Sequence, residues 1–146
     1  MKKNICVVGA GYWGKNHIKT LNQLNSLKGI VEINDHSFKN LSKEYPGIQL
    51  HDSVEASLQE DYDGFVIATP AITHYEIAKI LISAKKPVLI EKPMTLSNEE
   101  AKELVELSEQ HNVNVLVGHV LLFHPAVIKI KNMIRRGDIG NLQYLY

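Results

Sequence analysis

The feature that most constrains this chain is a glycine-spaced loop that follows a short apolar run near its start. Residues 5–8 read Ile-Cys-Val-Val, a run typical of a buried strand. Gly9, Gly11 and Gly14 follow at the spacing G-x-G-x-x-G, before a segment with helical periodicity. Gly9 permits a tight turn, Gly11 lets backbone N–H groups approach a phosphate, and Gly14 lets helix and strand pack closely. The loop therefore predicts a dinucleotide whose pyrophosphate lies at a helix N-terminus.

An acidic residue follows at the distance that such a loop requires. A second strand is expected over residues 29–33, and Asp35 lies about 20 residues after Gly14, the offset of a carboxylate that binds the adenosine ribose. The alternative is a surface aspartate that caps the next helix. A carboxylate at the ribose repels a 2′-phosphate, and the next residues, His36 and Ser37, supply no arginine to hold one. NAD is therefore the expected cofactor, and NADP is less favoured.

Two aromatic residues stand inside the loop itself. Tyr12 and Trp13 are candidate cofactor contacts, although packing in the core is the favoured alternative because large aromatic side chains usually anchor cores. Trp13 starts a row with helical spacing that continues through His17, Leu21 and Leu24. This row predicts the buried face of the first helix, with His17 as a packing residue.

Apolar runs alternate with helical segments along the rest of the chain. The expected strands cover residues 5–8, 29–33, 48–50, 65–68, 87–90 and 113–117. Such alternation predicts an α/β fold, a doubly wound parallel (Rossmann) sheet of six strands with flanking helices. Ligands collect beyond the carboxyl ends of strands in this fold, which is where Thr69-Pro70 and Glu91-Lys92-Pro93 fall.

Composition excludes several classes of function. Basic and acidic residues balance at 16 each, so nothing favours nucleic acid or an acidic membrane surface as a partner. The chain has a single cysteine, Cys6, which fits a small buried hydrophobe within the first strand better than a reactive thiol. No signal peptide precedes that strand and no apolar run is long enough to cross a bilayer, so the expected location is the cytoplasm.

Several motifs together resemble the Gfo/Idh/MocA family of NAD(P)-dependent oxidoreductases, many of which act on sugars or inositols. The resemblance rests on Val-Val-Gly-Ala-Gly-Tyr-Trp-Gly at residues 7–14, Ala-Thr-Pro at residues 68–70 with His74, and Glu-Lys-Pro at residues 91–93. The last motif is the most discriminating, since a general Rossmann domain has no reason to carry it. The segment from Gly118 to Pro125 and the pair Ile139-Gly140 add support.

The resemblance implies roles for particular residues. Lys92 would be catalytic, orienting the substrate hydroxyl beside the nicotinamide and assisting its deprotonation. Glu91 would lie near the nicotinamide ribose. Three further residues would lie along the cofactor: Thr69, Pro70 and His74.

The chain departs from the family in two respects. Many members carry Asn or Arg where this chain has residues 119–124, His-Val-Leu-Leu-Phe-His, so a polar cofactor contact there is expected only from His119. His119 and His124 lack a carboxylate or cysteine cluster, so no metal is expected. The family's second domain is also nearly absent. Residues 1–121 are expected to form the dinucleotide-binding domain, and residues 122–146 the helix and first strand of a truncated substrate domain.

These observations favour the cofactor-binding part of an NAD-dependent dehydrogenase that acts on a secondary alcohol of a sugar or nucleotide-linked sugar. On its own this chain is expected to be catalytically incomplete. The alternative is a non-catalytic dinucleotide-binding module that acts as a sensor or scaffold, and a methyltransferase is a weaker third. The apolar segment 142–146 predicts a strand that lacks neighbours in this sequence, and such an edge could pair two copies into a homo-oligomer.

Overall fold

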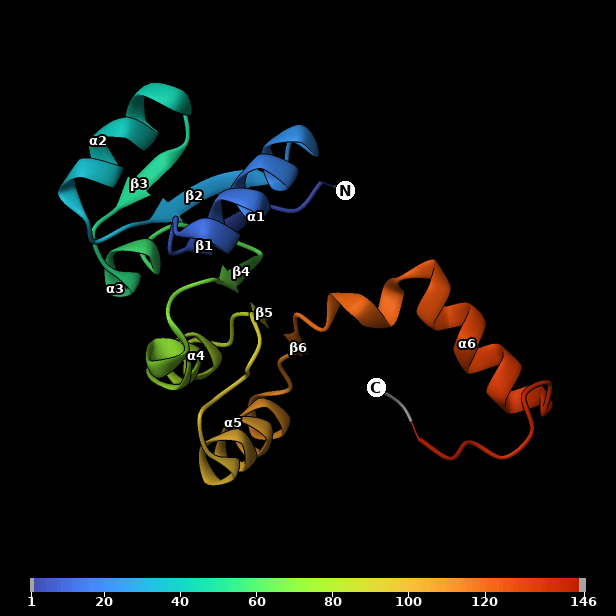
Figure 1. Cartoon of the computed structure of the whole chain (residues 1–146). Coiled ribbons are helices and arrows are strands. Elements are labelled where there is room, and N and C mark those ends of the chain that lie inside the picture. The colour runs from blue at the N-terminus through green and yellow to red at the C-terminus, as the bar shows by residue number, and fades with distance from the viewer. Residues whose placement is uncertain (1, 145–146) are drawn as a thin grey trace.

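The computed structural model describes residues 2–144 and has a six-stranded parallel sheet at its centre (Figure 1). The strands are β1 (Ile5–Val8), β2 (Leu27–Val31), β3 (Gln49–His51), β4 (Gly64–Ile67), β5 (Val88–Ile90) and β6 (Val115–Val117). Their order across the sheet is β3-β2-β1-β4-β5-β6, and every neighbouring pair is parallel. This order confirms the predicted doubly wound sheet.

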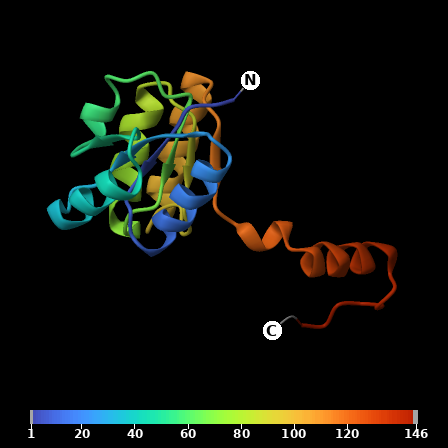
Figure 2. The ribbon, with the colours of Figure 1, turned by 90° about the horizontal axis from the view of Figure 1, so that it is seen from above.

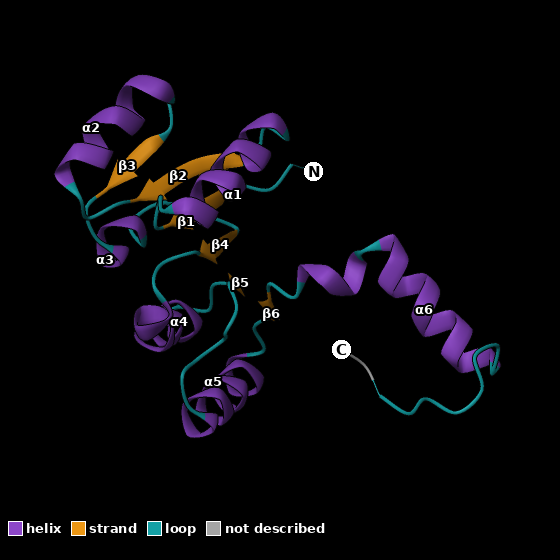
Figure 3. Cartoon of the chain, in the orientation of Figure 1, coloured by secondary structure: helices purple, strands orange, loops and turns teal. Residues whose placement is uncertain are grey.

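Helices cover both faces of the sheet (Figure 3). They are α1 (Tyr12–Gln23), α2 (Asp35–Glu44), α3 (Val54–Ser57), α4 (His74–Ser83), α5 (Asn98–His111) and α6 (Pro125–Arg136), with 3₁₀ turns η1 (Ala71–Thr73) and η2 (Val120–Phe123). Helices α1 and α2 lie on one face, and α3, α4 and α5 lie on the other. Alternate residues of β1 serve the two cores, because successive side chains of a strand point to opposite faces: Val7 packs with Ile18 of α1, while Cys6 and Val8 pack with Leu81 of α4.

Cys6 has the packing role expected from the sequence. Its side chain is fully buried, and this burial raises the pKa of the Cys6 thiol well above its ordinary value. A thiol that is buried and protonated is a poor nucleophile. Cys6 is therefore part of the core rather than a reactive site.

Local side-chain and glycine caps mark several helix ends. Ser97 accepts a hydrogen bond from the Glu100 N–H at 3.1 Å and caps α5. Ser53 does the same for α3. Gly137 ends α6 in the left-handed conformation, with φ at 76°, as a glycine after a helical segment favours.

Two expectations about the first βαβ unit are wrong. The second strand covers residues 27–31 rather than 29–33. In α1 the buried residues are Gly14 and Ile18, whereas Trp13 and Leu24 are exposed. The helix turns Gly14 toward β1 because only a residue without a side chain fits against the Gly9 carbonyl. This requirement overrides the apolar row that starts at Trp13.

The segment after β6 leaves the sheet (Figure 2). Turn η2 and helix α6 project away from the other elements, and no residue of α6 is buried. The described part of the predicted terminal strand, residues 142–144, is not a strand, and residues 145–146 lie outside the described residues. Over residues 2–144, no helix is long and apolar enough to cross a bilayer.

Candidate dinucleotide-binding site

The candidate site lies at the carboxyl edge of the sheet, where the strand order changes direction. Strand β1 pairs with β2 on one side and with β4 on the other, so chain connections leave in opposite directions from β1 and β4. The resulting crevice is the usual ligand position in open α/β sheets. The glycine loop follows β1 at this edge, and Thr69-Pro70 follows β4.

The three glycines of the loop have three different surroundings. Gly9 has a φ of +91°, and a Cβ there would lie 2.8 Å from Thr69 Cγ2. A Cβ on Gly14 would overlap the Gly9 carbonyl oxygen. A Cβ on Gly11 would meet no atom within 4 Å. Gly9 and Gly14 are therefore required by the fold itself, whereas the space at Gly11 is left for a ligand.

The N-terminus of α1 opens into that space. Gly11 is the N-cap residue and makes no side-chain cap hydrogen bond. The N–H groups of a first helical turn have no partner within the helix, and they carry the positive end of the helix dipole. An uncapped N-terminus beside an open glycine backbone fits a phosphate group.

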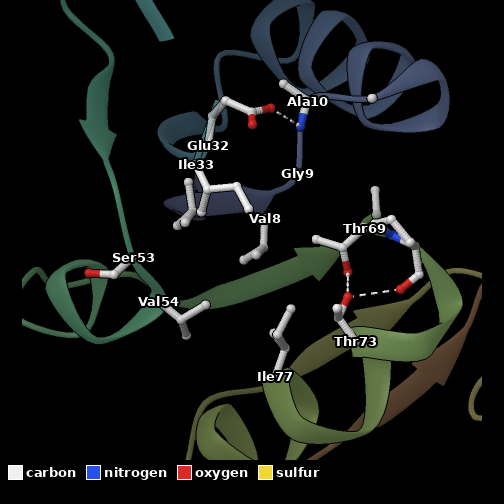
Figure 4. Close-up of a pocket in the computed structure, with 14 residues that line it drawn as sticks. Val8, Gly9, Ala10, Glu32, Ile33, Ser53, Val54, Thr69, Thr73 and Ile77 are labelled. Atoms are coloured by element: carbon white, nitrogen blue, oxygen red, sulfur yellow. Dashed lines mark hydrogen bonds between the residues drawn. The ribbon is translucent and has the colours of Figure 1, made fainter. Parts of the chain in front are cut away.

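A cavity of about 360 Å³ lies against the glycine loop (Figure 4). We call it the loop cavity. Its lining comes from β1, β2, β4, α3, α4 and their connections: Val8, Gly9, Ala10, Gly11, Val31, Glu32, Ile33, Ser53, Val54, Ala68, Thr69, Pro70, Thr73 and Ile77. The lining is mainly apolar, and Glu32 contributes its one carboxylate.

Glu32 is held at the end of β2 by two backbone groups. Its carboxylate accepts hydrogen bonds from the Ala10 N–H at 3.0 Å and from the Asn34 N–H at 2.9 Å. The first of these bonds ties the carboxylate to the glycine loop (Figure 4). A carboxylate fixed beside both a glycine loop and an apolar cavity is well placed to accept hydrogen bonds from ribose hydroxyls.

Asp35, the acid singled out from the sequence, lies elsewhere. It is the exposed first residue of α2 and does not line the loop cavity. The expected strand end lay two residues too far along the chain. Because β2 ends at Val31, the acid that directly follows the strand is Glu32. The signal for Glu32 was present in the sequence, but the expected strand 29–33 enclosed it as a strand residue.

The turn after β4 is organised by hydroxyl and imidazole groups. Thr73 Oγ1 lies 2.8 Å from both Thr69 Oγ1 and the Pro70 carbonyl oxygen. His74 is 1% exposed, with Nδ1 2.8 Å from the Pro93 carbonyl oxygen and Nε2 2.9 Å from the Thr69 carbonyl oxygen. His74 therefore joins the turns after β4 and β5. Both its ring nitrogens face main-chain oxygens, and the expected place of His74 along a cofactor stays a prediction.

A second cavity, of about 260 Å³, continues from the first toward β5. We call it the junction cavity. Its lining combines the glycine loop with the turns after β4 and β5: Gly11, Tyr12, Trp13, Ala68, Thr69, Pro70, Ala71, His74, Glu91 and Lys92. Gly11, Thr69 and Pro70 line both cavities, so the two adjoin.

Tyr12 and Trp13 stand at this second cavity rather than in the core. Tyr12 is 83% exposed and Trp13 is 46% exposed. Their rings meet edge to face, with centroids 6.0 Å apart and planes at 87°. The favoured alternative of core packing is therefore wrong, and both side chains are available to a ligand.

Glu91 and Lys92 differ in exposure to solvent although they are neighbours in the chain. Glu91 is buried, and its Oε1 lies 2.7 Å from His17 Nε2. Lys92 is exposed and lines the junction cavity. It also lines a third cavity, of about 390 Å³, which we call the turn cavity; the other lining residues are Gly118, His119, Val120, Leu121 and Leu122. Lys92 thus lines both the second and the third cavity, and the exposed His119 lines the third.

The family profile described as oxidoreductase family, NAD-binding Rossmann fold, matches residues 3–119. The chain belongs to this oxidoreductase family. The match covers the whole sheet and all three cavities up to His119, so the glycine loop and the Glu91-Lys92-Pro93 turn lie within one family domain.

Curated relatives in this oxidoreductase family are dehydrogenases. The chain is 30% identical over 139 residues to UDP-N-acetylglucosamine 3-dehydrogenase of Acidithiobacillus ferrooxidans, covering 95% of this chain and 42% of that protein. It is 28% identical over 141 residues to inositol 2-dehydrogenase of Mycolicibacterium smegmatis, covering 93% of this chain and 41% of that protein. The chain therefore spans less than half the length of these relatives.

A solved structure agrees with the family assignment. The WlbA dehydrogenase from Bordetella pertussis, in complex with NADH and UDP-GlcNAcA, superimposes with a TM-score of 0.89 and 26% sequence identity. The match covers 96% of this chain and 44% of that one. The oxidoreductase family fold is thus present across nearly the whole chain.

Metal-ligating side chains do not gather in the described part of this family member. Within residues 2–144, no group of three or more His, Cys, Asp or Glu side chains lies close enough together to hold an ion.

Proposed function

We propose that this chain forms the NAD-binding part of a dehydrogenase that oxidises a secondary alcohol of a sugar or nucleotide-linked sugar. One observation carries the proposal: three adjoining cavities lead from the glycine loop, past Trp13, to Lys92. A dinucleotide is an elongated ligand with an anionic centre, and this row offers an uncapped helix N-terminus beside its first two cavities.

The loop cavity would take the adenosine half of NAD. Its apolar lining, which includes Val8, Val54 and Ile77, suits the faces of an adenine ring. Glu32 would accept hydrogen bonds from the adenosine ribose, a role that we assign to it in place of Asp35. A ribose 2′-phosphate beside the fixed carboxylate of Glu32 would bring like charges together, which favours NAD over NADP.

Lys92 would serve the reacting end. Oxidation of a secondary alcohol removes a hydride from carbon and a proton from oxygen, and NAD supplies the hydride acceptor when bound. The ammonium of Lys92 would donate a hydrogen bond to the substrate oxygen and stabilise the negative charge that develops there as the hydroxyl proton passes to water. The turn cavity that Lys92 lines also carries the apolar side chains of residues 120–122, which suit the face of a substrate ring.

The relatives support a substrate in the sugar class. Their names specify UDP-N-acetylglucosamine and inositol, which are both ring polyols or derivatives of them. Each offers secondary hydroxyl groups to a dehydrogenase. The particular substrate of this protein would be decided by residues that contact it, and the turn cavity supplies one side of that contact.

Trp13 offers a direct test of cofactor binding. It is the chain's single tryptophan and lines the junction cavity, so NADH bound there should quench Trp13 emission and show sensitised NADH emission. Leu24→Trp in a Trp13→Phe background places the indole at the exposed end of α1 as a matched control. Saturable transfer from Trp13 and much weaker transfer from residue 24 is the expected result. No saturable signal from Trp13 would reject the proposed cofactor site.

Turnover separates the proposed dehydrogenase from a binding module. NADH formation should be followed with sugars, nucleotide sugars and inositols, using both this chain and any longer form of the protein that contains it. We expect binding without turnover by this chain, because positioning of donor and acceptor carbons supplies much of the rate and Lys92 faces exposed apolar residues. Steady turnover by this chain would refute its incompleteness. Binding with no turnover by any longer form would favour a sensor or scaffold.

A further inference from the structure

A partly buried contact between His17 and Glu91 connects the helix of the glycine loop to the turn that carries Lys92. His17, in the second turn of α1, places Nε2 2.7 Å from Oε1 of Glu91, which follows β5. Glu91 is one of three buried polar or charged residues in the described chain, and its side chain is 9% exposed. The two residues are 74 positions apart in sequence, so the pair joins elements that the chain itself does not connect directly.

Glu91 is enclosed from two further sides. Its Oε2 accepts a hydrogen bond from the Lys92 N–H at 3.3 Å. A Cβ on Gly118, which follows β6, would lie 3.1 Å from Oε2 and 3.3 Å from Oε1. The carboxylate is therefore fixed by α1 on one side, by the backbone of Lys92 on another, and by a glycine that leaves no spare room.

Within the described residues, hydrogen bonds of the sheet hold the main chain as far as Glu91 but do not reach Lys92. The Glu91 N–H donates to the Ile67 carbonyl at 2.9 Å, and the Gly118 N–H donates to the Ile90 carbonyl at 2.8 Å. The sheet thus fixes the backbone as far as Glu91. The carboxylate bond to the Lys92 N–H extends that order by one residue, to the position whose side chain stands between two cavities.

Stability alone is a weak reason for such a pair. Burying polar groups costs free energy that their hydrogen bond only partly returns, and apolar residues of similar volume often stabilise a fold equally well. The location is more informative, because Glu91 itself lines the junction cavity beside Trp13 and Lys92.

We propose that His17 is a positioning residue for Lys92, and that it acts through Glu91. The proposal rests on the proposed function, in which Lys92 stands at the reacting end of bound NAD. The helix that receives the phosphates and the turn that presents the lysine then share one contact. Disturbing that contact moves Lys92 and leaves the glycine loop in place.

The test compares bound NADH with ADP-ribose, which carries both phosphates and no nicotinamide. In this chain, His17→Leu should alter the emission of directly excited bound NADH and leave the ADP-ribose dissociation constant within about twofold of wild type. His17→Gln, which retains a donor toward Glu91, should restore most of the wild-type emission. Asn22→Leu introduces the same residue on the exposed side of α1 and should change neither measurement.

A double-variant comparison tests whether His17 acts on bound NADH through Lys92. Lys92→Met should itself alter the emission, and adding His17→Leu to it should produce no further change, because interacting residues are not additive. Gly118→Ala supplies a second disruption that removes neither partner, should His17→Leu fail to fold. Its Cβ should displace the Glu91 carboxylate and alter the emission in the same direction.

Three results would overturn the positioning role while leaving the proposed function intact. The first is a change in NADH emission on adding His17→Leu to Lys92→Met that is as large as the change in wild type. The second is a loss of ADP-ribose affinity in His17→Leu well beyond twofold. The third is wild-type NADH emission in Gly118→Ala. A wild-type chain that binds neither NADH nor ADP-ribose would overturn both proposals.

Discussion

The loop, junction and turn cavities form a row, and the two ends of this cavity row are built in different ways. At the loop cavity, each polar group is held by a neighbour: Glu32 by the Ala10 and Asn34 N–H groups, and Thr69 by Thr73. At the turn cavity, Lys92 and the apolar residues 120–122 are exposed. The first end is ordered before any ligand arrives, whereas the second presents a lysine and apolar surface to solvent. Under the proposed function, cofactor binding and chemistry therefore depend on separable parts of the chain.

The largest effect should come from filling the open space at the loop end. Gly11→Val should weaken NADH binding more than about 100-fold, because its side chain would occupy the approach to the helix N-terminus. The fold should be retained, since a Cβ there meets nothing within 4 Å. Calorimetric titration and thermal melting measure the two quantities.

Gly14→Val is the matched control for that substitution. Its side chain would overlap the Gly9 carbonyl, so the free energy of unfolding should fall by more than about 3 kcal/mol. A Gly11→Val protein that binds NADH normally, or a Gly14→Val protein with wild-type stability, would contradict the assigned division of roles.

A smaller and more selective effect is expected at the other end. In a catalytically complete form of the protein, Lys92→Met should bind NADH within about threefold of wild type. Its turnover should fall about 100-fold, the usual scale for a group that assists proton transfer. Stopped-flow measurement of hydride transfer would decide this, and a near-normal rate would remove Lys92 from the reaction.

The two candidate ribose acids give the next comparison. Glu32→Gln should weaken NADH binding about tenfold, because a charged acceptor for hydroxyl groups becomes neutral. Asp35→Asn should change binding less than about twofold, since Asp35 lies outside the loop cavity. The reverse order of effects would return the ribose contact to Asp35.

The smallest predicted effect concerns a polar cluster outside the cavity row. His51 Nε2 lies 2.8 Å from Tyr62 Oη, which donates to Gln49 Oε1 at 2.8 Å, so His51 donates to Tyr62. Burial lowers the pKa of His51 below its ordinary 6.5. The unfolded chain then binds more protons than the folded one just below that pH, so the stability contributed by neutral His51 is present above pH 6.5 and is lost as pH falls toward its folded pKa.

Urea unfolding between about pH 7.5 and about pH 5.5 measures this contribution. Wild type should lose more stability over the range than His51→Gln, which keeps a donor and does not titrate. Cofactor affinity per folded molecule should be unaffected by the substitution. Identical pH slopes for the two proteins would show that His51 titrates normally.

The sequence predicted the sheet and the glycine loop because both depend on local signals. Short apolar runs bordered by Gly or Pro mark β1, β4 and β5, and the capping of α5 by Ser97 needs only its neighbours. Errors arose where a contact across the fold decided the outcome. Gly14 turned α1 away from the predicted face because of the Gly9 carbonyl, and that rotation exposed Trp13.

Other parts of the site were beyond a single sequence for the same reason. The contact of His17 with Glu91 spans 74 positions, and no periodicity in α1 indicates it. The approach of both His74 ring nitrogens to backbone carbonyls likewise depends on contacts between separate turns. The proposed choice of Glu32 over Asp35 as the ribose acid depends on where β2 ends, a boundary that the sequence prediction misplaced by two residues.

Calorimetric titration of NADH and NADPH into this chain tests the central claim most directly, namely that the loop end is a preformed site for NAD. NADH should bind saturably with one site per chain and at least about tenfold more tightly than NADPH, because Glu32 opposes a 2′-phosphate. Equal or tighter binding of NADPH, or no binding of either cofactor, would contradict the account.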